Sequence, residues 1–89
     1  MKTQKIKISG KVQGVYFRAS AKQKALNLGL QGYVKNNQDG SVLMEVEGND
    51  EAIGEMVNWC RQGPALARVS EIRVEPLQPQ NFTGFRIER

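Results

Sequence analysis

The stretch from Gly10 to Arg18, which reads GKVQGVYFR, holds the residues of this 89-residue sequence that are best placed to do chemistry. A strand-like alternation leads into a loop that contains Gly14, and the loop ends at Arg18, where a helical pattern begins. A strand, a tight loop and a helix N-terminus point successive main-chain N–H groups into one concavity. With a guanidinium at its edge, such a concavity suits a dianionic phosphate, because the planar fork of arginine matches pairs of phosphate oxygens.

The loop lacks the fingerprints of nucleotide-binding sites. It has no G-x-G-x-x-G run and no Gly-Lys-Ser/Thr ending, so we predict a site for one small phosphoryl group. Arg18 could instead be a solvated arginine, but a cation in the first turn opposes the helix dipole and is better explained by an anion that binds between them. Gly14 is expected to adopt a positive φ or to let a ligand approach the backbone closely.

Asn36, at the end of a predicted strand, is a second candidate for the site. It could orient a water molecule, or it could be a turn residue whose amide bonds its own backbone, and its position alone favours the turn. Asn37, Asp39 and Gly40 follow directly and are typical of a tight turn.

The chain contains no histidine and a single cysteine, Cys60. It therefore lacks the commonest metal ligand and the commonest general base at neutral pH, and its acids show no metal-binding spacing, so we expect no metal and no cofactor. Cys60 lies on the apolar face of a predicted helix and is expected to be a buried thiol. A hydrolase of this kind could act only on a substrate whose leaving group needs little help, such as the carboxylate of an acyl phosphate.

Hydrophobic periodicity predicts an α+β fold with the ferredoxin-like order β-α-β-β-α-β. The expected sheet is antiparallel, with four to five strands and two helices on one face. We predict strands at 5–12, 32–36, 42–46, 69–74 and 85–87, the fourth stopped by Pro76. We predict helices at 18–28 and around 53–60, the second capped by Asn49 or Asp50 and ended by Gly63-Pro64.

Length and composition place residues 1–89 in one globular domain, with 39% hydrophobic and 25% charged residues. The net charge of +4 favours anionic partners mildly. Because the basic residues do not cluster with aromatic ones, a small anionic ligand is favoured over nucleic acid. No segment resembles a signal peptide or a membrane span, so we expect a cytoplasmic monomer without a membrane partner.

Two long segments resemble the signatures of the acylphosphatase family. The first is Gly10 to Arg18, and the second runs from Gly32-Tyr33-Val34-Lys35-Asn36 through 37–42 to Gly48. Gly63-Pro64, Ala67 and Val69 are also similar to the family, as is the ending Phe85-Arg86-Ile87. The resemblance covers essentially the whole chain, and both signatures occur in the expected order.

The resemblance implies metal-independent hydrolysis of the carboxyl-phosphate bond of small acyl phosphates, with carboxylate and inorganic phosphate as products. It implies that Arg18 holds the phosphate and that Asn36 orients the attacking water. The phosphate is then also bound by main-chain amides of the loop, which are those of Gln13, Gly14, Val15, Tyr16 and Phe17.

An alternative is a non-catalytic, acylphosphatase-like anion-binding or regulatory module, since such domains also occur within larger carbamoyl-transfer maturation proteins. An RNA-binding domain of the same topology is disfavoured, because the central strands offer no aromatic platform for bases.

Overall fold

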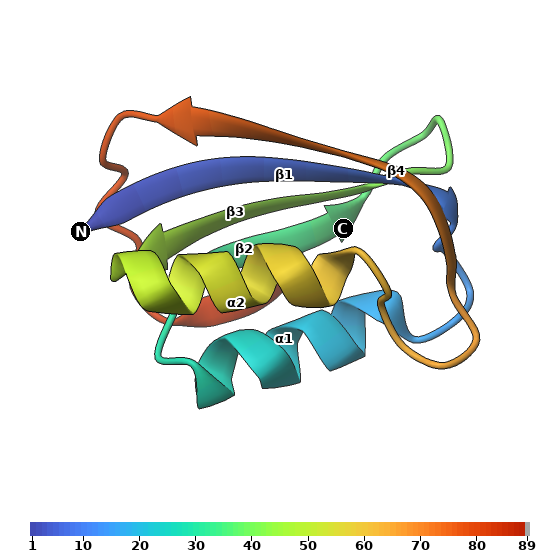
Figure 1. Ribbon diagram of the computed structural model, residues 1–89, viewed down its shortest axis with the longest axis horizontal. Coiled ribbons are helices and arrows are strands. Elements are labelled where there is room, and N and C mark those ends of the chain that lie inside the picture. Colours follow the sequence, from blue (N-terminus) through green and yellow to red (C-terminus); the bar gives the residue numbers. More distant parts are fainter. Residues whose placement is uncertain (89) are drawn as a thin grey trace.

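A computed structural model describes residues 1–88 and contains one five-stranded sheet with two helices on one of its faces (Figure 1). This layering confirms the predicted ferredoxin-like α+β arrangement. The elements in chain order are β1 (Lys2–Lys11), α1 (Phe17–Asn27), β2 (Gln31–Asn36), β3 (Val42–Gly48), α2 (Asp50–Cys60), β4 (Arg68–Leu77) and β5 (Phe85–Glu88).

The strands lie in the order β4-β1-β3-β2-β5. The predicted antiparallel pairing holds for β1 to β4, but β5 pairs with β2 in parallel, so the sheet is mixed. The reason is the path of the chain. β4 ends where Leu77 is opposite Thr3, and β5 begins where Phe85 is opposite Gly32, which is the same end of the sheet. The 78–84 connection therefore crosses that end, and β5 must run in the direction of β2.

The fourth strand does not stop at Pro76 as predicted. β4 continues to Leu77, and Pro76 is in register with Gln4 of β1. A proline cannot donate a ladder hydrogen bond, but β4 is an edge strand and forms a ladder on one side only. A proline usually ends a strand, but Pro76 instead lies within a strand at the edge of the sheet.

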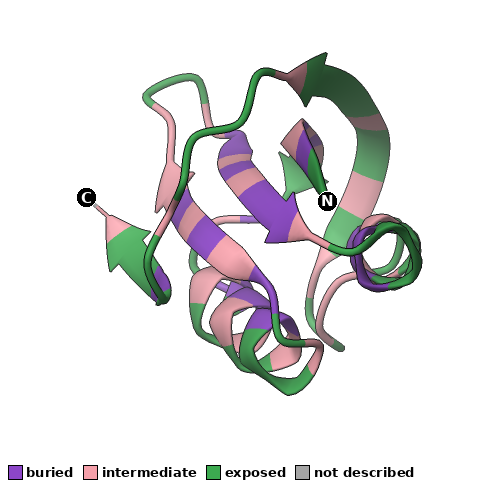
Figure 2. Ribbon diagram, turned by 90° about the vertical axis from the view of Figure 1, so that its left-hand side faces the viewer, coloured by how far each residue is buried: buried purple, intermediate pink, exposed green. Residues whose placement is uncertain are grey.

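The core lies between the sheet and the helices. Alternate strand residues, among them Ile6 and Ile8 of β1 and Met44 of β3, are completely buried on the helical side. α1 covers β2 and β5, and α2 covers β1 and β3, so each helix turns its buried residues to a different half of the sheet (Figure 2). Each such side chain stabilises the fold by roughly 1.5–3 kcal/mol through burial, which makes the sheet a rigid support for the residues at its ends.

A buried carboxylate, Glu47, lies at the end of β3. It is 2% exposed, and it accepts hydrogen bonds from the Thr3 hydroxyl at 2.5 Å and from the main-chain amides of Gln80 and Phe82 at 2.8 and 2.9 Å. These hydrogen bonds lower the pKa of Glu47 from 4.5 to about 2, and the bond from Thr3 has the largest effect. Burial alone would raise the pKa. Glu47 thus ties the connection before β5 to the centre of the sheet.

Replacing this carboxylate should destabilise the protein in a pH-dependent way. Glu47→Gln should lower the free energy of unfolding at neutral pH by about 3 kcal/mol, because hydrogen bonds to a charged group contribute about 1.5–3 kcal/mol each. Since the pKa is lower in the folded state, the contribution of Glu47 is complete above its ordinary pKa of 4.5 and is lost as the pH falls toward 2. Urea unfolding at a series of pH values should show the difference from wild type closing over that range.

The matched control is Glu71→Gln, because Glu71 pairs with Arg73 on the exposed face of β4. That change should cost less than about 1 kcal/mol at any pH. A Glu47→Gln protein as stable as wild type at neutral pH would contradict the assignment.

Candidate active site

The loop between β1 and α1 is anchored by three buried side chains, Val12, Val15 and Phe17. Between them, Gly14 and Tyr16 are exposed and have positive φ angles of 74° and 64°. Alternation of left-handed residues with ordinary ones turns successive N–H groups to one side of the chain, which is the geometry of an anion-binding nest. The expected positive φ of Gly14 is confirmed, and a Cβ at this position would meet no atom within 4 Å.

The N–H groups of this loop have no hydrogen-bond partner in the described part of the chain. Within residues 1–88, no hydrogen bond is donated by a main-chain amide from Gln13 to Arg18. α1 also begins without help from side chains: the side chain of its N-cap, Tyr16, makes no capping hydrogen bond, and its first turn contains no acid. By contrast, Asn49 caps α2 by accepting from the Ala52 amide at 2.8 Å. The start of α1 is therefore suited to an external anion.

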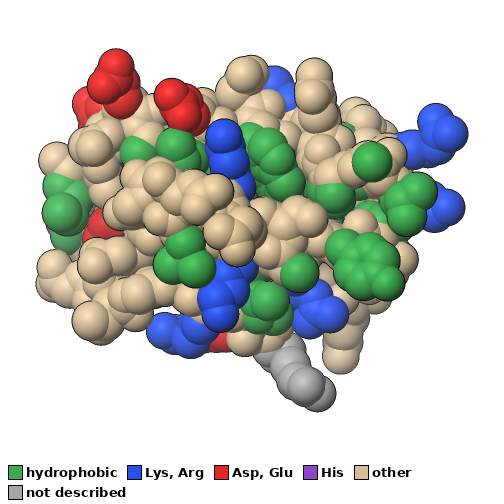
Figure 3. Space-filling model, turned by 90° about the horizontal axis from the view of Figure 1, so that it is seen from below, with side chains coloured by type: hydrophobic (Ala, Val, Ile, Leu, Met, Phe, Trp, Pro, Cys, Tyr) green, Lys and Arg blue, Asp and Glu red, His purple; other side chains and the backbone are tan. Residues whose placement is uncertain are grey.

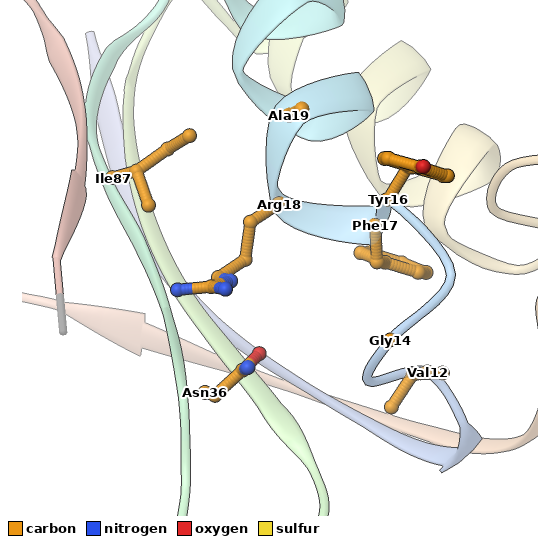
Figure 4. A pocket seen from close by; sticks show the side chains of 8 residues that line it. All are labelled: Val12, Gly14, Tyr16, Phe17, Arg18, Ala19, Asn36 and Ile87. Atoms are coloured by element: carbon orange, nitrogen blue, oxygen red, sulfur yellow. The ribbon is translucent and has the colours of Figure 1, made fainter.

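A cavity of about 620 Å³ opens in front of this loop. Figure 4 shows the Arg18 guanidinium, from the first turn of α1, and the Asn36 amide, from the end of β2, extending toward the same space. None of the three ion pairs found among residues 1–88 involves Arg18. The lining residues are Val12, Gly14, Tyr16, Phe17, Arg18, Ala19, Asn36 and Ile87.

Asn36 brings unmet hydrogen-bonding capacity to the cavity. Its Oδ1 atom is buried and has no hydrogen-bond partner in the described chain. A buried polar atom without a partner costs about 1–3 kcal/mol, and such atoms are rare in folded proteins. If Asn36 were only a turn residue, its side-chain oxygen should accept a hydrogen bond from the nearby backbone. No such hydrogen bond is found within residues 1–88. A water or substrate group that reached Oδ1 would remove this cost.

The turn after Asn36 is held by its own side chains and by Gln13 from the loop. Asp39 Oδ1 accepts from the main-chain amide and the hydroxyl of Ser41, at 2.9 and 2.6 Å, as expected for turn chemistry. The Gln13 side-chain nitrogen donates to the carbonyl oxygens of Asn37 and Ser41, at 2.8 and 2.9 Å. The side chain of Gln13 is therefore engaged with the turn, and only its main-chain amide is left for an anion.

Other charges around the site are dispersed. Lys and Arg side chains are spread over the helical face rather than joined in one continuous patch (Figure 3). In the part of the chain described, no group of three or more Cys, Asp or Glu side chains is placed to hold a metal ion.

None of the helices within residues 1–88 has the length and apolar character needed to span a membrane.

Comparison with known proteins decides the family. The sequence model of the acylphosphatase family matches residues 4–87 of this chain. The chain belongs to the acylphosphatase family. An acylphosphatase from Aeropyrum pernix is 50% identical over 86 residues, which are 93% of this chain and 84% of the relative. The crystal structure of an acylphosphatase from Bacillus subtilis superposes with a TM-score of 0.97, at 31% identity and with 100% of both chains covered.

The same unit also occurs inside a larger protein. The structure of HypF from T. kodakarensis is similar to all of this chain with a TM-score of 0.84 and 38% identity, but the match covers only 12% of HypF. Acylphosphatase-like structure is therefore compatible with more than one context. That residues 1–89 form one independent domain stays a prediction.

The structure brings together the residues that the sequence singled out. Arg18 and Asn36 line one cavity together with Gly14, Tyr16 and Phe17 of the loop. Gln13 and Val15, which were also predicted to bind phosphate, are not among its lining residues. Cys60 lies elsewhere, fully buried at the C-terminal end of α2, and burial raises its pKa to about 12, as expected of an inert thiol. Ile87 was not predicted to line the site, because its place there depends on the direction of β5.

Proposed function

We propose that this acylphosphatase hydrolyses small acyl phosphates to a carboxylate and inorganic phosphate, using Arg18, Asn36 and the loop amides. The observation that carries the proposal is the convergence on one cavity of unpaired loop N–H groups, an arginine without an ion pair and an asparagine with an unpartnered oxygen. Each of these groups lacks a partner within the described chain. A phosphoryl group would be the partner of the loop N–H groups and of the arginine, and an attacking water would be the partner of the asparagine oxygen.

The loop and Arg18 would bind the phosphate. The amides from Gln13 to Phe17 would donate to the phosphate oxygens, and the Arg18 guanidinium would bind two of them as a fork. The positive end of the α1 dipole adds to the same attraction. These groups also stabilise the charge on the phosphoryl oxygens in the transition state, which is the main task of catalysis in phosphoryl transfer.

Asn36 would position the nucleophile. Its Oδ1 can accept a hydrogen bond from water, so the amide can orient the water oxygen toward phosphorus without acting as a base. As the water oxygen bonds to phosphorus, the phosphorus–oxygen bond to the acyl group breaks, and the carboxylate leaves with the electron pair. The proton of the water passes to a phosphate oxygen, so no histidine is needed.

The acyl part of the substrate would lie against the apolar part of the cavity. Ile87 and Tyr16 are 39% and 77% exposed, and both line the cavity together with Ala19. Arg18 is the one charged side chain among the lining residues within residues 1–88. We therefore propose a substrate with one phosphoryl group and an uncharged acyl group.

A non-catalytic anion-binding module is the second candidate, and the similarity to a small part of HypF favours it. The two functions differ in one observable. A binding module would hold inorganic phosphate without turning over an acyl phosphate.

Hydrolysis of benzoyl phosphate by the purified protein should proceed equally fast with and without a strong chelator. The expectation follows from the absence of histidine and of clustered ligands in residues 1–88. The measurement is the loss of benzoyl phosphate absorbance over time. Activity that disappears in chelator and returns with a divalent ion would refute metal independence, and phosphate binding without hydrolysis would favour the binding module.

Arg18→Ala should weaken binding of inorganic phosphate and abolish most activity in a folded protein. Two charge-assisted hydrogen bonds at about 1.5 kcal/mol or more each correspond to a loss of at least about 10²-fold. Arg18→Lys should recover little, because an ammonium group cannot reproduce the fork. Inhibition by phosphate gives the affinity, and Arg73→Ala on the exposed face of β4 is the control. Undiminished phosphate affinity in folded Arg18→Ala would count against the proposal.

Asn36→Ala should reduce kcat on the order of 10²–10³-fold, as removal of a single preorganised polar group does in other enzymes. Inhibition by inorganic phosphate should change little, because Asn36 acts on the water. Asn36→Asp should fail as well, since a carboxylate near the dianion adds repulsion. Asn58→Ala, on the exposed side of α2, is the matched control. A defect confined to KM would return Asn36 to a structural role.

A further inference from the structure

The side chain of Gln13 connects the two halves of the site. Its nitrogen donates to the main-chain oxygens of Asn37 and Ser41, at 2.8 and 2.9 Å, across 24 and 28 residues of sequence. Among the hydrogen bonds of residues 1–88, these are the ones that join the phosphate loop to the turn between β2 and β3. The two hydrogen bonds use both protons of the Gln13 side-chain nitrogen, so they fix the orientation of the amide group as well as its distance from the turn.

The turn that Gln13 contacts is itself closed by hydrogen bonds. The Asn37 amide donates to the Ser41 carbonyl at 2.8 Å, and the Asn37 side chain donates to the Ser41 hydroxyl at 2.9 Å. Lys7 on β1 adds an ion pair with Asp39 at 3.1 Å, but both side chains are about half exposed, so its contribution is small. Among the hydrogen bonds of residues 1–88, those of Gln13 are therefore the ones that oppose movement of the loop relative to this turn, in addition to the buried side chains that anchor the loop.

Asn36 directly precedes this turn, and the loop amides directly follow Gln13. We propose that the Gln13 side chain is a positioning residue that fixes the distance between the bound phosphate and the water held by Asn36. This inference rests on the proposed hydrolytic function. Two neutral hydrogen bonds contribute only about 0.5–1.5 kcal/mol each to stability, but a displacement of about 1 Å between reacting groups can cost on the order of 10²-fold in rate.

Glutamine is suited to this task by its length and its two donors. Ionised glutamate has no donor and would face two carbonyl oxygens. Methionine has a similar length but no donor, so Gln13→Met removes both hydrogen bonds with little change in volume. Gln23→Met is the matched control, because Gln23 makes one exposed hydrogen bond to Asn27 within α1, at 3.1 Å.

The first test is the kinetics of Gln13→Met on benzoyl phosphate. We expect kcat to fall on the order of 10–10²-fold while inhibition by inorganic phosphate changes by less than about 3-fold, since the loop amides and Arg18 remain. Gln23→Met should behave as wild type. A folded Gln13→Met with wild-type kcat, or with a loss confined to phosphate affinity, would overturn the proposal.

The second test asks whether Gln13 acts through Asn36. In an Asn36→Ala background, Gln13→Met should reduce kcat by less than about 3-fold further, because the group that it positions is already gone. Independent losses that multiply would show a merely structural role and overturn the proposal. Gln13→Glu supplies a pH signature: its activity relative to wild type should rise as the pH falls through the ordinary range of a glutamate, about 4.3, because the protonated carboxyl regains one donor.

The two proposals fail in different ways. If the wild-type protein does not hydrolyse benzoyl phosphate, the proposed function fails before Gln13 is tested. If wild type is active and Gln13→Met does not fold, the pH dependence of Gln13→Glu decides, and a flat ratio to wild type would overturn the positioning role.

Discussion

The site depends on a stretch of main chain whose N–H groups have no hydrogen-bond partner within residues 1–88. Backbone donors are normally satisfied by helices, sheets or side chains, and a loop that keeps several of them unpaired must be fixed by other means. Here the fixing groups are the buried side chains of Val12, Val15 and Phe17. Phe17 also packs edge-on against Trp59 of α2, with ring centroids 5.3 Å apart. Hydrophobic burial thus holds a polar surface in place.

The remaining parts of the site are placed relative to this loop by the sheet. β1 bends at Gly10, where the register against β4 shifts and a Cβ would collide with the carbonyl oxygen of Arg68. β2 ends at Asn36, and β3 separates the two strands, so the loop and the asparagine lie at the same end of the sheet. The sheet determines this placement coarsely, and the hydrogen bonds of Gln13 refine it.

The sequence predicted the residues whose role is local. Gly14 and Arg18 could be found because a loop glycine and a cation against a helix dipole are visible within a few positions. The position of Asn36 alone favoured a turn residue, and its proposed role came from the resemblance to the acylphosphatase family. The role of the Gln13 side chain and the burial of Glu47 could not be found, because their partners lie 24 to 44 residues away in sequence. The parallel direction of β5 was not predicted for the same reason. The end of the fourth strand was predicted wrongly because a proline is compatible both with the end of a strand and with an edge strand.

The position of β5 has a consequence for the order in which the cavity can form during synthesis. Arg18 and Asn36 leave the ribosome early, but Ile87, which completes the cavity, belongs to the last strand. β5 is also at the edge of the sheet, where it pairs only with β2. The central strands and the loop between β1 and α1 can therefore form first, and the cavity is complete only after β5 has paired with β2. The cavity thus joins segments from both ends of the described chain, and its completion depends on an edge strand.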